Sequence, residues 1–323
     1  MNKYVKKGLC IILATGLIAT SFAGCAKIKY VTEGAVQAIH EIKDGSWQNQ
    51  GEEQGGASDE DVSVIEEFVA GTYGGVEFKS VEDVINFYKE AYDYSKTLTA
   101  QYKDKDGNTQ TFYKLLGEEN LEVGNILIDG SANAMINNLV PGIVGGLYSP
   151  GLNGLVPSTN RDPKLDTDGW DGNGESLATS RIVPEDILAA NVKDNGDGTV
   201  TVQLQPKAVN MSMPGADAQG HVFQTLGAID SVVDSISALS WSEGTTADNC
   251  KVNYKEGVAT VTINASTKEI VSADYTMKAF VNVTHANIAV IKDKSASLDI
   301  TMQWKYPASA EYLQSSKGVT LVG

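Results

Sequence analysis

Two stretches near the carboxyl end, ADYTMKAFVNV at residues 273–283 and SLDITMQWKY at residues 297–306, have an apolar side chain at every second position. Most of the residues between these positions are Asp, Thr, Lys, Asn or Gln. A period of two is typical of a β-strand that buries one face. A slip of one residue would bring the apolar face of either strand into water, so the sequence specifies their register well.

Shorter runs repeat this alternation, VTVQL at 200–204 and ATVTI at 259–263. Turn sequences separate several runs. Asp106-Gly107 lies between the runs at 98–102 and 109–116, and Asp-Asn-Gly-Asp-Gly at 194–198 precedes Val200. Such Gly-containing turns between alternating runs favour β-hairpins. The sequence therefore predicts two hairpins and a carboxyl-terminal β-meander.

Two other segments, 80–96 and 221–239, place their apolar residues at helical spacing. Ser80 and Asp83 form a start signal for the first helix, and the acidic run at 58–61 favours the start of another. A sheet with one apolar face needs a cover. We therefore expect an α+β fold, in which two or more amphipathic helices cover a curved antiparallel meander. No βαβ alternation or Gly-rich phosphate loop favours a doubly wound fold.

The amino terminus has the order of a secretory signal. Lys3, Lys6 and Lys7 form a positive region, residues 9–19 are apolar, and Phe22-Ala23-Gly24-Cys25 follows. Residues 22–25 resemble the lipobox of bacterial lipoproteins, although Leu is usual where Phe22 stands. The resemblance implies cleavage before Cys25, a diacylglycerol on its thiol, and attachment to the outer face of the cell membrane. The paired acyl chains of such a lipid give stable anchoring.

This interpretation divides the chain into three parts: a signal peptide at 1–24, a lipidated amino terminus with a flexible tether at 25–57, and a single α+β domain at 58–323. Loss of three lysines with the signal leaves 22 basic against 41 acidic residues, a net charge of −19. So acidic a chain repels nucleic acid, and it repels anionic lipid headgroups. We expect the lipid to be the main contact with the membrane.

Cysteine use also follows from the lipobox. Cys10 leaves with the signal and Cys25 carries the lipid, so Cys250 has no partner for an intramolecular disulfide. Because the chain holds only three histidines, we expect Cys250 to be a structural thiol and not a nucleophile.

The segment 130–160 has no charged residue and is interrupted by Gly and Pro. If it lies beside the apolar face of the sheet, it could gate a cavity for an apolar or amphipathic ligand. Alternatively, it is a buried connection without a ligand. The candidate gating residues are Leu139, Ile143, Val144, Leu147, Tyr148, Leu152 and Leu155. The order of elements is similar to that of the half-barrel lipid carriers of bacterial envelopes.

An acidic, Gly-rich region follows this segment. Its carboxylates are Asp162, Asp166, Asp168, Asp171 and Glu175. Oxygen ligands on a Gly-rich loop suit Ca²⁺, but the spacing is not that of an EF-hand, so solvated turns are the alternative. No other cofactor is indicated.

Three classes of function remain open. The first is a non-catalytic binding or interaction module, including one for a lipid-like ligand. The second is a surface module for glycan or protein, for which Trp170 is the aromatic residue to test, since Trp304 fits a core position. The third is a hydrolase, although the chain has no GxSxG, HExxH, CxxC or P-loop motif.

Overall fold

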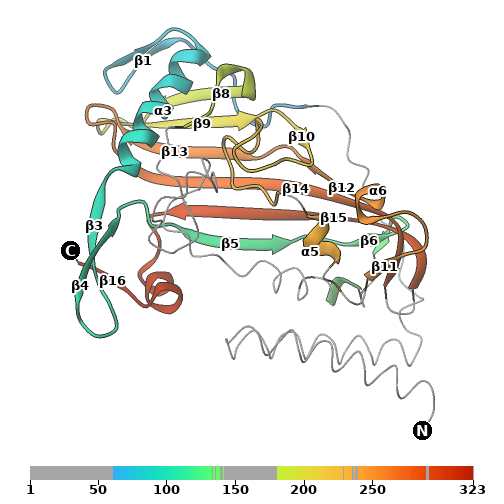
Figure 1. Ribbon diagram of the computed structural model, residues 1–323. Coiled ribbons are helices and arrows are strands. Elements are labelled where there is room, and N and C mark those ends of the chain that lie inside the picture. Colours follow the sequence, from blue (N-terminus) through green and yellow to red (C-terminus); the bar gives the residue numbers. More distant parts are fainter. Residues whose placement is uncertain are drawn as a thin grey trace.

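The computed structural model describes residues 61–132, 134, 136–138, 141, 180–227, 229–234, 236, 239–288 and 291–322. Strands dominate these ranges, and eleven of them form one sheet. Figure 1 shows this sheet as a broad, twisted layer with α3 crossing one end.

The longest strands, β14 (Ile270–Ile288) and β15 (Ile291–Tyr306), form an antiparallel hairpin at the centre of the sheet. Tyr275 faces Trp304 across it. β13 (Val258–Asn264) pairs antiparallel with the start of β14, which confirms the predicted meander.

Shorter strands complete the sheet along both sides of this hairpin. The central order is β7-β6-β15-β14-β13-β9-β8, while β5 pairs with β15, β11 and β12 pair with β14, and β10 pairs with β12. The bounds are β5 Glu118–Val123, β6 Leu127–Ile128, β7 Ser131–Ala132, β8 Ile187–Asp194, β9 Thr199–Pro206, β10 Val209–Asn210, β11 Leu239–Trp241 and β12 Cys250–Tyr254. The predicted turn at 194–198 joins β8 to β9 as a hairpin, as expected.

Two smaller sheets lie outside the large one. β1 (Gly71–Tyr73) pairs with β2 (Val76–Phe78). The predicted hairpin around Asp106-Gly107 is confirmed as β3 (Thr99–Lys103) and β4 (Thr109–Tyr113), and β16 (Thr320–Leu321) pairs with β3.

The predicted helix at 80–96 is α3 (Val81–Lys96). Ser80 accepts a hydrogen bond from the backbone N–H of Asp83, and the Asp83 carboxylate accepts one from the N–H of Ser80, so a complete capping box begins the helix. Its apolar side packs on the sheet, where the hydroxyls of Tyr88 and Tyr275 lie 2.8 Å apart in the core. α3 is the one helix longer than five residues in the described ranges.

The expected α+β fold with several covering helices is wrong, because the second helix does not form over 221–239. Among the described residues of this stretch, only α5 (Asp230–Asp234) is helical. Gly227 has a φ of +71°, which a right-handed helix cannot contain. Val222 and Phe223 are nevertheless fully buried, so an irregular segment brings the apolar side chains of this stretch onto the sheet.

The other helical pieces are single turns. They are η2 (Pro184–Asp186), α6 (Thr246–Asn249), α7 (Ala310–Tyr312) and the π-helical turn η3 (Leu313–Lys317). The turn η2 ends at Asp186, because the chain continues as β8.

The predicted helix start at 58–61 is not continued in residues 61–70, which contain neither helix nor strand. We call residues 61–66 the strap. Side chains of the sheet hold the strap backbone in an irregular form that bends at Ile65, and these long-range bonds outweigh its local helix signals.

Candidate binding site on the polar face of the sheet

The large sheet has two chemically different faces. On β13, β14 and β15, most apolar positions of the sequence pattern are buried, while Val283, Leu298 and Tyr306 are partly buried. The intervening positions are partly or fully exposed. Val261, Tyr275 and Trp304 belong to the buried face, and Trp304 is therefore a core residue as expected. We call the opposite side the polar face.

Hydroxyl and amide side chains form cross-strand pairs over the polar face. The Gln303 amide donates to both carboxylate oxygens of Asp274, at 3.0 and 2.9 Å, and Thr276 donates to the same carboxylate at 3.0 Å. The Gln203 amide donates to the Thr260 hydroxyl at 3.3 Å. Such pairs add to sheet stability, and they make this surface hydrophilic.

The charges on this face balance, although the whole chain has a net charge of −16. The strand registers place the following acids and lysines on it: Glu118, Glu122, Asp274, Asp299, Lys193, Lys251, Lys278 and Lys305. The lysines offset the acids in number. The face therefore does not share the repulsion of other anions that the overall charge implies.

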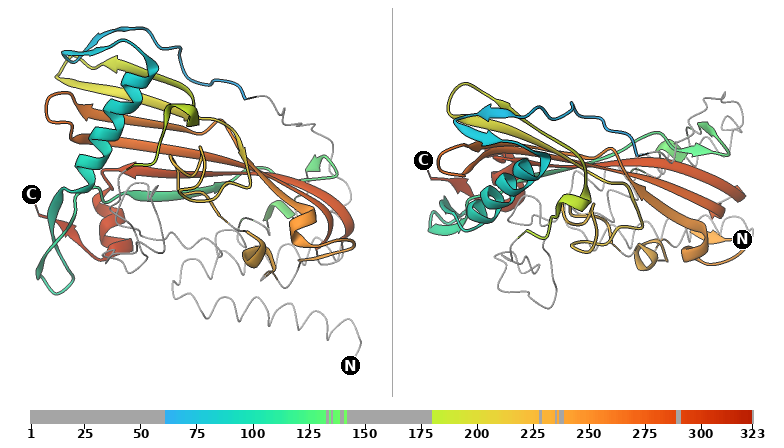
Figure 2. Two further views of the ribbon diagram at one scale, coloured as in Figure 1. Left: turned by 45° about the horizontal axis from the view of Figure 1, so that its top comes forward. Right: turned by 90° about the horizontal axis from the view of Figure 1, so that it is seen from above.

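At the β8–β9 end, two amide side chains hold the strap against this face. The Gln205 Oε1 accepts a hydrogen bond from the Val64 N–H at 2.8 Å, and its Nε2 donates to the Val62 carbonyl at 2.8 Å. The Asn191 Nδ2 donates to the Glu66 carbonyl at 2.9 Å. Seen from above, the strap lies on one side of the sheet and α3 on the other (Figure 2, right). We call Gln205 and Asn191 the amide clamp.

The amide clamp is buried and incompletely satisfied. Gln205 is fully buried and Asn191 is 3 % exposed. Both Gln205 amide atoms are bonded, but the Asn191 Oδ1 is buried without a hydrogen-bond partner. Buried acceptors are usually paired, so this atom marks a place where a further donor would be favourable.

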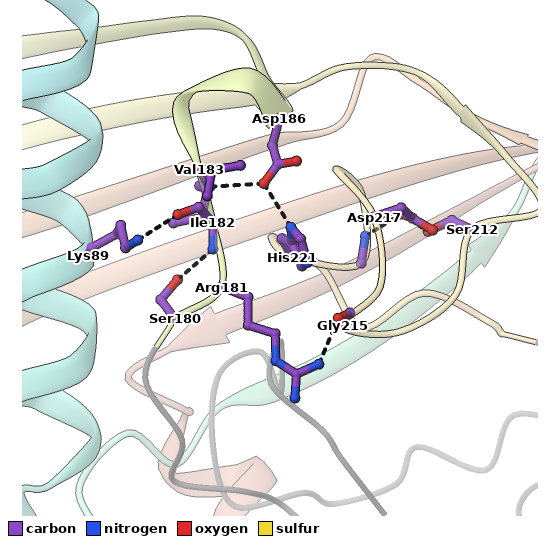
Figure 3. A network of polar contacts seen from close by, with 11 residues as sticks. Lys89, Ser180, Arg181, Ile182, Val183, Asp186, Ser212, Gly215, Asp217 and His221 are labelled. Carbon is purple, nitrogen blue, oxygen red and sulfur yellow. Dashed lines mark hydrogen bonds and ion pairs between the residues drawn. The ribbon is translucent and has the colours of Figure 1, made fainter.

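A second polar network lies on the core side of the sheet (Figure 3). It holds the loop at 212–220, directly before the irregular segment that replaces the expected helix. The Asp217 carboxylate accepts hydrogen bonds from the Ser212 hydroxyl at 2.6 Å and from the N–H groups of Met213 and Gly220 at 2.8 and 2.9 Å. Arg181 donates to the Gly215 carbonyl at 2.9 Å. These bonds close the loop at 212–220 and join it to the chain before β8.

The same network contains a histidine–carboxylate pair. The His221 Nδ1 lies 2.7 Å from the Asp186 Oδ2, which also accepts the Val183 N–H. Such a pair is part of a catalytic triad only if the other ring nitrogen activates a nucleophile. Within the described ranges His221 has no hydroxyl or thiol partner, and Ser212 bonds to Asp217 instead. The contact between His221 and Asp186 therefore links the chain before β8 to the loop after β10.

Cys250, at the start of β12, is buried at 3 % exposure. Burial, with a smaller effect of the Asp230 carboxylate, raises the pKa of its thiol to about 11. A thiol with so high a pKa is mostly un-ionised near neutral pH, which agrees with the interpretation as a structural thiol.

Most residues singled out from the sequence lie outside the described ranges. They are Cys25, the gating candidates Leu139, Ile143, Val144, Leu147, Tyr148, Leu152 and Leu155, the calcium candidates Asp162, Asp166, Asp168, Asp171 and Glu175, and Trp170. Among the residues that are described, no three His, Cys, Asp or Glu side chains group as metal ligands. Nor does any helix in these residues have both the length and the apolar content to cross a membrane.

Sequence reasoning missed the amide clamp. Gln203 and Gln205 occupy polar positions of an alternating strand. The alternation shows which face a side chain is on, but it does not show whether an amide is solvated or binds a segment over 140 positions earlier in the chain. The polar face itself follows directly from the alternation.

In comparisons with protein-family models, curated proteins and solved structures, the chain matched none of them.

Proposed function

We propose that the protein is a bacterial lipoprotein, attached to the outer face of the cell membrane through Cys25, whose domain is a non-catalytic interaction module. The two-faced sheet carries the proposal for the domain: one face buries the core, and the other presents paired hydroxyl and amide groups with balanced charge. Recognition surfaces combine such polar groups with a rigid scaffold.

The anchoring part of the proposal rests on residues 3–25, with the positive region, the apolar run and the small residues before Cys25. A domain held in this way would meet its partner at the cell surface. The interaction part rests separately on the paired hydroxyl and amide groups of the polar face.

The anchoring is tested with Cys25→Ser in the producing cell, with Cys10→Ser as the matched control. We expect Cys25→Ser to lose incorporation of a labelled fatty acid and to leave the membrane fraction, whereas Cys10→Ser behaves as wild type. If Cys25→Ser is labelled and retained as wild type is, the chain is not a lipoprotein of this type.

The interaction surface is tested by placing a photo-crosslinking residue at Asn282 or Lys305 on the polar face, and at Asn108 in the exposed β3–β4 turn as the control. We expect adducts with envelope components from the polar-face positions and none from position 108. Equal adducts at all three positions, or none on the face, would contradict the proposal.

A further inference from the structure

The strap is held differently from every strand of the sheet. Val62, Val64 and Glu66 alternate along the strap, and each turns a backbone group towards the amide clamp. The chain bends at Ile65, between the bonds to Gln205 and the bond to Asn191. The clamp therefore binds backbone groups on both sides of this bend, and it binds the strap through its backbone and not through its side chains.

We propose that the amide clamp is a binding site for an acidic, non-helical segment of a partner polypeptide, and that the strap of the same chain occupies this site in the present structure. The proposal rests on the proposed function and names the partner class for its polar face.

The acidic preference comes from the two ends of the strap. Glu66 forms an ion pair with Lys193 at 2.9 Å, and the Asp61 carboxylate accepts the backbone N–H of Ala208 at 3.0 Å. Both contacts lie beside the clamp and favour a carboxylate. A partner segment with two acidic residues five positions apart can form both contacts, as Asp61 and Glu66 do in the strap.

The strap occupies the site only loosely. Val62 and Val64 are 54 % and 51 % exposed, so their side chains bury little apolar surface. No backbone ladder joins the strap to β8 or β9, and the bonds to Gln205 and Asn191 come from side chains. Because it belongs to the same chain, the strap has a high effective concentration at the site, which compensates for few contacts.

The unpaired Asn191 Oδ1 indicates that the strap is not the best ligand for the site. This atom is buried and the strap offers it no donor. Leaving a buried acceptor unpaired costs free energy that a ligand with a donor at this point recovers. A partner segment that supplies such a donor can therefore replace the strap.

The test uses the full chain with Val64→Pro, which removes the N–H that Gln205 accepts, together with a labelled peptide of residues 61–67 (DVSVIEE). We expect this peptide to bind Val64→Pro at least about tenfold more tightly than wild type, whose site is filled by its own strap. Val64→Ala, which keeps the N–H, is the matched control and should behave as wild type. In Val64→Pro, amide hydrogen exchange of residues 61–66 should be faster.

Two further controls ask whether the clamp itself binds the peptide. Adding Gln205→Leu to Val64→Pro should weaken binding by about tenfold or more, and so should N-methylation of the peptide nitrogen that corresponds to Val64. Should Val64→Pro fail to fold, Glu66→Lys, an exposed change that removes the ion pair with Lys193, replaces it.

Absence of peptide binding to a folded Val64→Pro, or a strap that stays protected from exchange in it, overturns the proposal. So does binding that is indifferent to Gln205→Leu. Membrane attachment and the cross-links from Asn282 and Lys305 are measured independently, so a failure here leaves the proposed function standing. Binding of an envelope polysaccharide without binding of the peptide would also overturn the peptide assignment alone.

Discussion

The two faces of β14 differ by a single step along the chain. Tyr275 is fully buried and bonded to Tyr88, whereas its neighbour Thr276 is partly exposed and bonded to Asp274 on the polar face. One strand thus supplies both the core and the proposed interaction surface. The core face therefore provides most of the stability, and side chains of the polar face can be replaced without unfolding the protein.

The largest effect is expected on the core face. Tyr275→Ala should lower the free energy of unfolding by about 3–5 kcal/mol, because it leaves a cavity and deprives the Tyr88 hydroxyl of its partner. Urea unfolding followed by tryptophan fluorescence measures the loss.

The matched control is Thr276→Ala on the adjacent position of the polar face. Its cost should stay below about 1 kcal/mol, since a partly exposed side chain loses its bond to Asp274 at 3.0 Å and a longer one from Gln303 at 3.4 Å. Equal losses for the two variants would mean that the faces are not separated as described.

A smaller loss of stability is expected in the loop at 212–220, which the Asp217 carboxylate closes on the core face. Asp217→Ala removes the acceptor of Ser212, Met213 and Gly220, and should cost about 1–3 kcal/mol. Hydrogen exchange should show faster opening of residues 212–221 and unchanged protection of β14. Should β14 lose protection to the same extent, the segment would be part of the central folding unit and not a separate cover.

At the edge of the core face, Ser80→Ala removes the cap of α3 and should cost about 1 kcal/mol in thermal or urea unfolding. Ser80→Asp retains a capping oxygen and should unfold like wild type. A loss of the same size in Ser80→Asp would point to the hydroxyl, and not the cap, as the stabilising group.

The smallest effect at neutral pH concerns Cys250. Burial raises the pKa of the folded thiol to about 11, above the value of about 8.5 in an unfolded chain. The stabilisation is therefore complete below about pH 8.5 and is lost as the pH rises through the folded pKa. Stability should be insensitive to this group at pH 7 and should fall between about pH 8.5 and 11.

Alkylation provides the measurement for this thiol. At about pH 8.5 the native protein should react with iodoacetamide far more slowly than the urea-unfolded protein, because little of its thiol is ionised. Rapid reaction of the native protein would show that Cys250 is accessible and ionised. Cys25 must carry its lipid or be replaced by Ser in this experiment.

The sequence was sufficient where the pattern is local and repeated. The alternation in 273–283 and 297–306 predicted the meander and its buried face, and the Ser80–Asp83 signal predicted the start of α3. It was insufficient over 221–239, where Val222 and Phe223 are buried in an irregular segment and, of the described residues, only Asp230–Asp234 are helical. There Gly227 has a positive φ and Asp217 closes a loop upstream, and neither effect appears in a periodicity.

The candidate site also has one part that the sequence predicts and one part that it does not. The sequence determined the polar face, because a period of two dictates which side chains point away from the core. The fold, and not the sequence pattern, brings Gln205 and Asn191 against residues 61–66 and holds these residues without a helix, against the helix signals of their own sequence. The physical reason is that hydrogen bonds between groups distant in the chain depend on where the fold places them, whereas propensities and periods act only between neighbours.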